Sequence, residues 1–286
     1  MKLSFKAFAK INLFLDMESR REDGYHDILS VMQTIDLCDL ITLETIESGI
    51  ELLNDIGIEK ERDLAYRAAE AFFEAVGERG GVRISVDKKI PMGAGLAGGS
   101  ADAAAVLRGL NKLYGEPLTK ERLAEIGLSL GSDVPFCVIG GTQITRGRGE
   151  KMTPMPSMPD CPIVVAIGDD HVSTPAQFAE LDRRFENFVS YKPRDECVDG
   201  LCDAFLNKST IIEKYLYNIF EITGRFSPEI KEVMTACGAR GTLMSGSGSS
   251  VFGIFLNDAD AATAADRLTE IGYRAFMCRP VKYDIQ

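Results

Sequence analysis

The sequence predicts an α+β protein of two domains: a mixed α/β domain over residues 1–157 and a ferredoxin-like domain over residues 158–286. A chain of 286 residues is long enough for two hydrophobic cores, although a single domain is the alternative. Beyond residue 158 the predicted elements follow the order β-α-β-β-α-β with helices inserted, which is the ferredoxin-like order. Prolines gather where we place the boundary, as is typical of linkers: Pro154, Pro156, Pro159 and Pro162.

In the first domain, apolar residues alternate with polar ones in the expected strands and recur at helical spacing in the expected helices. Asp63 and Thr119 stand before two of these helices as capping residues. In chain order, the sequence predicts strands at 2–17, 28–36 and 39–46, a helix at 64–76, a strand at 82–90, a helix that includes 103–114, a helix at 119–131, and an apolar strand-like run at 136–144.

In the second domain, Ser173 or Thr174 caps a helix whose first position is Pro175, and Asp258 caps the last helix. The elements expected there are a strand at 163–167, the helix after residue 174, one or two helices between 198 and 222, a helix from 227 to 238, strands at 241–244 and 251–256, a helix at 259–271, and a strand at 273–281.

The composition is that of an ordinary globular protein, with 45% apolar residues, 26% charged residues and a formal net charge of −11. This charge argues against a nucleic-acid surface, so an anionic substrate must meet a local cluster of donors. Residues 1–15 carry lysines in a strand-like alternation, unlike a signal peptide, and nothing in the sequence is typical of a transmembrane span. We therefore expect a cytoplasmic protein without a membrane partner. The sequence indicates no oligomeric state.

Cysteine and histidine usage limits the metal chemistry. The seven cysteines are odd in number and scattered, without a Cys-x-x-Cys pair, which is typical of buried thiols. Only two histidines are present, which excludes a histidine-rich metal site. Any metal is expected to be a hard cation held by oxygen and phosphate.

A glycine-rich stretch at 91–102, Pro-Met-Gly-Ala-Gly-Leu-Ala-Gly-Gly-Ser-Ala-Asp, joins a predicted strand to a predicted helix. Glycines let backbone N–H groups converge on one bound group, and a helix start adds unpaired donors and partial positive charge, so phosphate fits this loop. Gly93, Gly95 and Gly98 also satisfy the dinucleotide fingerprint, but that fold requires a second strand that ends in an acidic residue about 20 residues later, and this distance lands near Pro117, between two predicted helices. Walker and protein-kinase motifs are absent from the sequence. A tight connection without a ligand is the remaining alternative.

Three further segments are candidates for function, each with a structural alternative. A turn after residue 22 displays Tyr25 and His26 at a loop end, unless it is a plain hairpin. Asp133 follows a helix end, where a carboxylate is commonly a turn or capping residue. The serine- and glycine-rich turn at 245–250 is either a second anion-contacting loop that faces the first or a plain connection.

Three motifs occur in order along the chain: Ala-Lys-Ile-Asn-Leu at 9–13, the glycine loop at 91–102 and Leu-Met-Ser-Gly-Ser-Gly at 243–248. With these motifs the chain resembles the GHMP kinases, the superfamily of galactokinase, homoserine kinase, mevalonate kinase and phosphomevalonate kinase. The similarity is greatest to members that act on a cytidine-diphosphate alcohol. Further marks of those members stand at 23–26, 131–136 and 251–253. The similarity spans most of the chain, and the departures from the usual residues are Ala97, Ala101 and Ser132.

The resemblance implies transfer of the γ-phosphoryl group of ATP to a hydroxyl of this alcohol, with Mg²⁺ as cofactor. It implies that Lys10 and Asp133 are the catalytic pair, that Tyr25 and His26 hold the cytosine, and that Phe178 stacks on its other face. Ser100 is the candidate metal ligand. The residues that would bind ATP are Pro91, Met92, Gly93, Ala94, Gly95, Leu96, Ala97, Gly98, Gly99, Ser100 and Ala101. The other residues that would contact the substrate are Asn12, Gly246, Ser247 and Gly248.

The residue chemistry agrees with this implication, because phosphoryl transfer requires positioning and charge neutralisation more than covalent chemistry. One alternative is another kinase of the superfamily, acting on homoserine or mevalonate, which gives no role to residues 24–26. A nucleotide-binding module without enzymatic activity is a second alternative. It would be expected to lack Lys10 or Asp133, and both are present.

Overall fold

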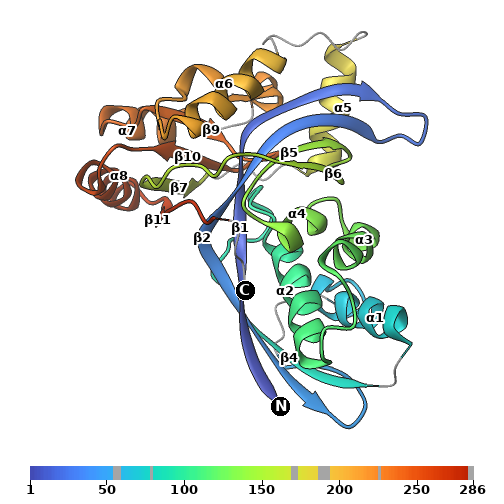
Figure 1. Cartoon of the computed structure of the whole chain (residues 1–286). Coiled ribbons are helices and arrows are strands. Elements are labelled where there is room, and N and C mark those ends of the chain that lie inside the picture. Colours follow the sequence, from blue (N-terminus) through green and yellow to red (C-terminus); the bar gives the residue numbers. More distant parts are fainter. Residues whose placement is uncertain (54–58, 78–79, 169–172, 186–193, 225–226, 283–286) are drawn as a thin grey trace.

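A computed structural model describes residues 1–53, 59–77, 80–168, 173–185, 194–224 and 227–282. A long hairpin of two strands, β1 (Lys2–Arg20) and β2 (His26–Ile46), runs through the length of the molecule (Figure 1). The antiparallel register shifts between Phe8 and Lys10, between Asn12 and Phe14, and between Met17 and Ser19. Such irregularities bend and twist a strand pair, which explains why this hairpin curves.

Within the described residues, seven strands form the larger sheet, in the order β3-β4-β2-β1-β8, with β5 on β2 and β6 on β5. Strand β2 has two different neighbours along its length, because residues 40–46 pair with β4 and residues 28–33 pair with β5. The strands that join the hairpin are β3 (Gly49–Leu52), β4 (Gly81–Asp87), β5 (Thr142–Gly147), β6 (Lys151–Pro154) and β8 (Tyr217–Asn218).

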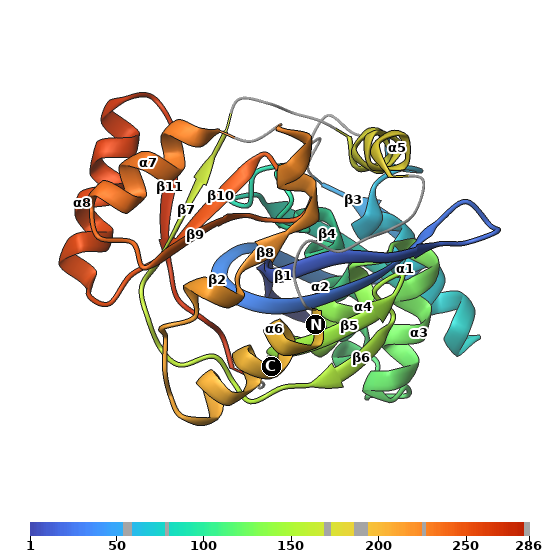
Figure 2. The same cartoon turned by 90° about the horizontal axis from the view of Figure 1, so that it is seen from above.

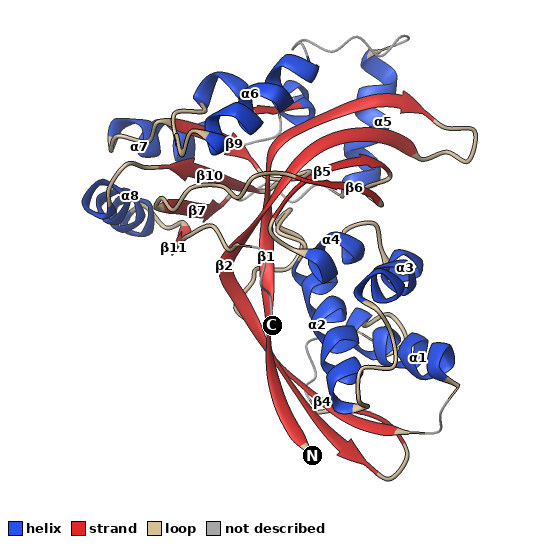
Figure 3. Ribbon diagram, in the orientation of Figure 1, coloured by secondary structure: helices blue, strands red, loops and turns tan. Residues whose placement is uncertain are grey.

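Four helices lie together beside the long hairpin (Figure 3). Two of the predicted caps are confirmed: Asp63 accepts hydrogen bonds from the backbone N–H groups of Ala65 and Tyr66, and Thr119 accepts one from Arg122. The helices are α1 (Leu64–Val76), α2 (Gly98–Leu113), α3 (Lys120–Leu130) and α4 (Val134–Ile139).

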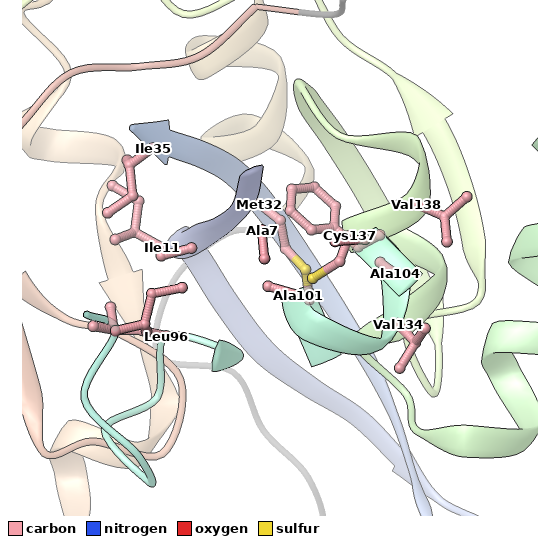
Figure 4. Close-up of a cluster of buried hydrophobic side chains, with 14 of the residues drawn as sticks. Ala7, Ile11, Met32, Ile35, Leu96, Ala101, Ala104, Val134, Cys137 and Val138 are labelled. Atoms are coloured by element: carbon pink, nitrogen blue, oxygen red, sulfur yellow. The ribbon is translucent and has the colours of Figure 1, made fainter. Parts of the chain in front are cut away.

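Helix α2 packs its alanine-rich face against the hairpin and α4, where small side chains allow close approach (Figure 4). Ala101 and Ala104 of α2 meet Ala7 and Met32 of the hairpin and Cys137 of α4 in one buried cluster. This packing fixes the start of α2, and with it the glycine loop, relative to β1. The cluster is the part of the core that lies under the candidate site.

The smaller sheet has the strand order β11-β7-β10-β9, and every neighbouring pair is antiparallel. With α7 and α8 between its strands, this order confirms the predicted ferredoxin-like arrangement. Figure 2 shows this unit on the side of the hairpin opposite α1, α3 and α4. Its elements are β7 (Ile163–Ile167), α7 (Pro228–Ala236), β9 (Gly241–Met244), β10 (Ser250–Ile254), α8 (Asp258–Glu270) and β11 (Arg274–Cys278).

Two further helices lie between β7 and α7, namely α5 (Thr174–Arg184) and α6 (Arg194–Leu206), and two short 3₁₀ turns follow them at Glu213–Tyr215 and Ile219–Thr223. The last described residues return to the larger sheet, because Val281 donates a backbone hydrogen bond to Thr34 of β2. The division of the chain between residues 157 and 158 stays a prediction.

Three predictions of local structure were wrong. The run at 136–144 is not one strand, because residues 134–139 form α4 and β5 begins at Thr142. Residues 134–139 are all apolar, so their spacing cannot distinguish a buried helix from a buried strand. The strands expected at 28–36 and 39–46 are one strand, β2. Asn257, rather than Asp258, caps α8 by accepting a hydrogen bond from the Asp260 N–H group.

Candidate active site

The glycine loop connects β4 to α2 and ends in left-handed backbone. Gly93 and Gly95 have φ angles of 67° and 77°, and Ala97, the N-cap of α2, has a φ of 58°. Ala97 therefore adopts a conformation that normally favours glycine. The side chain of Ala97 forms no cap, so the first N–H groups of α2, at residues 98–100, have no partner within the helix. These donors and the positive end of the helix dipole make an anion site.

A second loop, residues 245–250, packs directly on the first. The Ser245 hydroxyl donates to the carbonyl of Gly95 over 3.0 Å, and the Ser250 N–H donates to the carbonyl of Ala94 over 3.1 Å. A Cβ atom on Gly246 would lie 3.0 Å from the Gly95 carbonyl oxygen and 3.3 Å from Lys10 Nζ. Only glycine leaves room for this close approach, so the two loops face each other as the sequence predicted.

Lys10 lies where the two loops meet, and its side chain is 4% exposed. Its Nζ atom donates to Asn12 Oδ1 over 2.8 Å and to the Gly95 carbonyl over 3.0 Å. Asn12 Oδ1 also accepts from the N–H of Gly246 over 3.0 Å, and its amide nitrogen donates to Ser30. Asn12 thus fixes the position of the Lys10 ammonium between β1 and the second loop.

Asp133 stands at the N-terminus of α4, with Oδ2 3.8 Å from Lys10 Nζ. Its side chain makes no capping hydrogen bond to the helix, so the capping alternative is not supported. The side chain is 33% exposed, in contrast to that of Lys10. This carboxylate therefore faces accessible space while it remains in reach of a buried ammonium group.

An aromatic cluster lies at the other end of the site. His26 and Phe178 stack with ring centroids 4.4 Å apart and an angle of 3° between the rings, and Phe220 meets Phe178 edge-on at 4.9 Å. His26 Nε2 forms a hydrogen bond of 2.8 Å with Asp182. Tyr25 is half-exposed, and the guanidinium carbon of Arg148 lies 3.6 Å from its ring centroid. Phe178 thus contacts His26 directly in this structure.

One cavity of about 860 Å³ joins the two glycine-containing loops to the aromatic cluster. Most of the predicted site residues line it: Lys10, Asn12, Tyr25, His26, Gly93, Ala94, Gly95, Ala97, Gly98, Gly99, Ser100, Asp133, Phe178, Gly246 and Ser247. Five others do not: Pro91, Met92, Leu96, Ala101 and Gly248. Leu96 and Ala101 belong to the buried core, and Met92 is exposed.

A buried cluster of charges supports the loop from below. Lys88 Nζ lies 2.5 Å from Asp39 Oδ2 and 2.7 Å from Asp102 Oδ2, and Asp39 also accepts from the N–H groups of Lys89 and Ile90. Burial, with the nearby charge of Asp39, raises the pKa of Asp102 to about 8, although the ammonium of Lys88 opposes this shift. These contacts hold the chain just before the glycine loop.

Gly98 packs on this support. A Cβ atom on Gly98 would lie 3.0 Å from Ile90 Cγ2 and 3.4 Å from Lys88 Nζ. A larger side chain at Gly98 disturbs the support of the loop, whereas a Cβ on the neighbouring Gly99 would lie 3.4 Å from Leu64 Cδ1, an ordinary van der Waals distance. Gly99 is therefore the better position for testing the phosphate site.

Sequence reasoning missed several residues that line the cavity, above all Arg148 and Asp182. Arg148 follows β5, and the strand prediction that ended at residue 144 gave no reason to place its turn at the cavity. Asp182 meets His26 only because α5 packs there, and an exposed-looking aspartate on a helix carries no signal of this contact.

The described residues contain no cluster of three or more histidine, cysteine, aspartate or glutamate side chains that could hold a metal ion. None of the described helices is long and apolar enough to cross a membrane.

Both halves of the chain match models of a known protein family. Residues 63–141 match the GHMP kinases N-terminal domain, and residues 209–274 match the GHMP kinases C-terminal domain. The fold and the site together define the class: the protein is an ATP-dependent kinase.

Individual relatives show to which family within this class of kinases the chain belongs. A protein of Caldicellulosiruptor saccharolyticus named 4-diphosphocytidyl-2-C-methyl-D-erythritol kinase is 43% identical over 92% of this chain and 91% of its own length. A protein of Exiguobacterium sibiricum with the same name is 45% identical over 89% of each chain. The chain therefore belongs to the 4-diphosphocytidyl-2-C-methyl-D-erythritol kinase family of the GHMP kinases.

Solved structures agree with this assignment. The crystal structure of a 4-(cytidine 5'-diphospho)-2C-methyl-D-erythritol kinase superimposes with a TM-score of 0.82 at 38% identity, covering 97% of this chain and 99% of the other. Homoserine kinase from Cytophaga hutchinsonii superimposes with a TM-score of 0.72 at 18% identity, over 98% of this chain and 95% of the other. At that identity, the second similarity shows the fold alone.

Proposed function

We propose that the protein transfers the γ-phosphoryl group of ATP to the 2-hydroxyl of 4-diphosphocytidyl-2-C-methyl-D-erythritol, giving the 2-phosphate and ADP in non-mevalonate isoprenoid biosynthesis. One observation carries the proposal: a single cavity joins the Lys10–Asp133 pair and the glycine loop to an aromatic cluster. A substrate with a nucleobase at one end and an alcohol at the other has the shape that this cavity requires. The names of the relatives support the same substrate.

In the proposed reaction, the unpaired N–H groups at the start of α2 bind the ATP phosphates. Asp133 faces the acceptor hydroxyl, accepts a hydrogen bond from it and takes its proton as the oxygen attacks. Lys10 orients the carboxylate and the hydroxyl, because its ammonium group is held 3.8 Å from Asp133 by Asn12 and the Gly95 carbonyl.

Mg²⁺ is part of the proposal. Ser100 lines the cavity with Asp133, and a Cβ atom on Gly131 would lie 3.9 Å from the Ser100 hydroxyl oxygen. A hydroxyl beside phosphate oxygens fits a hard cation. Ser100 together with the nucleotide phosphates would hold the ion, which would neutralise part of the phosphate charge.

At the aromatic end, Tyr25, His26 and Phe178 are proposed to bind the cytosine. The 4.4 Å separation of the His26 and Phe178 rings leaves no space for a base between these two rings. Tyr25 is the ring with an exposed surface, and we assign it the first stacking contact. Homoserine and mevalonate have no aromatic group for such a cluster. The cytoplasm as location and the absence of nucleic-acid and membrane partners remain predictions from the sequence.

A coupled assay of ADP release with a panel of alcohols tests the proposal. We expect turnover with 4-diphosphocytidyl-2-C-methyl-D-erythritol and none above background with homoserine or mevalonate. The Asp133→Asn protein, purified in the same way, measures contaminating ATPase activity. Faster turnover of homoserine or mevalonate would replace the proposed substrate, and ADP release independent of any alcohol would argue against an alcohol kinase.

A further inference from the structure

We propose that Arg148 binds the diphosphate of the acceptor substrate and is the main cationic determinant of its affinity. This inference rests on the proposed function and deepens it. A cytidine-diphosphate alcohol carries its two phosphates between the base and the alcohol, so they must lie between the aromatic cluster and the Lys10–Asp133 pair. A residue that neutralises them has to line the middle of the cavity.

The charges around the cavity favour Arg148. Apart from His26, the basic residues that line it are Lys10 and Arg148, and two carboxylates, Asp133 and Asp182, line it as well. Lys10 is already engaged with Asn12, the Gly95 carbonyl and Asp133. A protein with a formal charge of −11 offers an anionic substrate no general attraction. A local cation is therefore required, and Arg148 supplies it.

The hydrogen-bonding state of Arg148 also indicates a ligand. Its Nε atom is buried, and within the described part of the chain it has no hydrogen-bond partner. A buried N–H donor without a partner costs free energy comparable to a lost hydrogen bond, and a phosphate oxygen would satisfy it. An arginine fork donates two parallel hydrogen bonds to a phosphate, which Lys10 cannot do.

The backbone fixes Arg148 beside the catalytic pair. Glu150 accepts a hydrogen bond of 2.6 Å from the Arg148 N–H, which closes a tight turn after β5. A Cβ atom on Gly149 would lie 3.2 Å from the carbonyl oxygen of Ser132, so the turn packs on the segment that carries Asp133. The guanidinium carbon lies over the Tyr25 ring, 3.6 Å from its centroid. Arg148 therefore stands between the ring assigned to the base and the carboxylate assigned to the hydroxyl.

Calorimetric titration with CDP and with cytidine separates two roles for this side chain. If Arg148 contacts phosphate, Arg148→Gln weakens CDP binding roughly 10- to 100-fold, the range for a charge-assisted hydrogen bond, and changes cytidine binding less than about threefold. Arg148→Lys keeps the charge without the fork and restores part of the CDP affinity. The affinity for a non-hydrolysable ATP analogue stays at the wild-type value.

The matched control is Arg146→Gln. Arg146 is exposed, lies two residues earlier on β5 and pairs with Glu18 and Asp195. We expect wild-type CDP binding from this variant and, from Arg148→Gln in steady-state assays, a raised KM for the acceptor with kcat within a few-fold. Far-UV circular dichroism and thermal unfolding establish that both variants are folded.

Three results would overturn the inference: CDP affinity unchanged in Arg148→Gln, equal losses for CDP and cytidine, or a loss confined to the ATP analogue. Equal losses would mean that Arg148 only supports Tyr25. In each of these cases the wild-type enzyme would still phosphorylate the cytidine-diphosphate alcohol. Failure of the wild-type protein to bind CDP and to turn over that alcohol would instead overturn the proposed function together with the inference.

Discussion

Replacing Asp133 by asparagine tests the proposed reaction most directly. The change keeps the size of the side chain and removes its charge and basicity. Asp133 makes no capping hydrogen bond, so α4 loses no contact. Lys10 keeps two neutral acceptors, Asn12 Oδ1 and the Gly95 carbonyl, so its ammonium remains solvated by the protein. We therefore expect a folded enzyme.

The size of the effect follows from the geometry. At the 3.8 Å separation of Lys10 Nζ and Asp133 Oδ2, an effective dielectric constant of about 20 gives an attraction of about 4 kcal/mol. This is an upper limit, because the Asp133 side chain is 33% exposed. A positioned acid–base group contributes roughly 10²- to 10⁴-fold, or about 3–5 kcal/mol of the barrier. We expect kcat to fall by that factor and substrate binding to change little.

A double-mutant cycle with Lys10→Ala completes this test. Because both side chains act on one transition state, the double variant should lose much less activity than the product of the two single losses. The measurements are kcat and both KM values for the four proteins. An Asp133→Asn enzyme within a few-fold of wild type would refute the assignment of Asp133. Independent, multiplicative losses would leave both residues important but not paired.

Three further changes test other parts of the structure. Tyr25→Ala should raise KM for the cytidylyl substrate roughly tenfold or more through lost stacking and leave KM for ATP unchanged, and equal effects on both constants would contradict its place at the base. Gly99→Asp should weaken ATP-analogue binding in titration roughly tenfold more than Gly99→Asn, because only the aspartate repels phosphate, and equal affinities would remove the start of α2 from the nucleotide site. Asp63→Ala should lower the free energy of unfolding by about 1–2 kcal/mol in denaturant melts, with Asp63→Asn near wild type, because the cap accepts two hydrogen bonds of 2.7 and 3.1 Å. An unchanged midpoint for the alanine variant would show that the cap contributes nothing.

Local chemistry made much of the fold predictable. The strand, glycine loop and α2 follow from a change of hydrophobic period with glycines between, and Asp63 and Thr119 mark helix starts by their side-chain oxygens. The ferredoxin-like order followed from alternating strands and capped helices. These signals lie within about ten residues of each other, so no knowledge of tertiary packing is needed to find them.

The long hairpin and α4 were not predictable in the same way. Strand β2 continues through residues 37–39 because β1 pairs with it on either side of a register shift, and that pairing joins residues far apart in the chain. Helix α4 has only six residues, and Pro135 stands in its first turn. So short a helix depends on burial against α2 and α3 rather than on its own propensity.

The residues of the candidate site also fall into two groups: those that a local sequence pattern predicts and those that depend on tertiary packing. Lys10, Asp133, Tyr25 and the two loops stood out by motif, because each is a short pattern in the sequence. Their roles as catalytic and binding residues stay predictions. Arg148 shows no motif of its own, and only the pairing of β5 with β2 brings its turn to the cavity. Asp182 likewise depends on the contact between α5 and the hairpin.

The position of Lys10 depends on both halves of the chain, because the oxygen atom that holds its ammonium group also accepts a hydrogen bond from the second loop. Asn12 Oδ1 accepts from Lys10 Nζ and from the N–H of Gly246, which follows β9 in the smaller sheet. The Gly95 carbonyl is shared in the same way, by Lys10 Nζ and the Ser245 hydroxyl. Removing the second loop would therefore take one of two donors from each of these acceptors and loosen the two groups that hold the lysine. The glycine loop and the lysine come from the N-terminal half, but their mutual geometry is set by a turn more than 140 residues further along the chain.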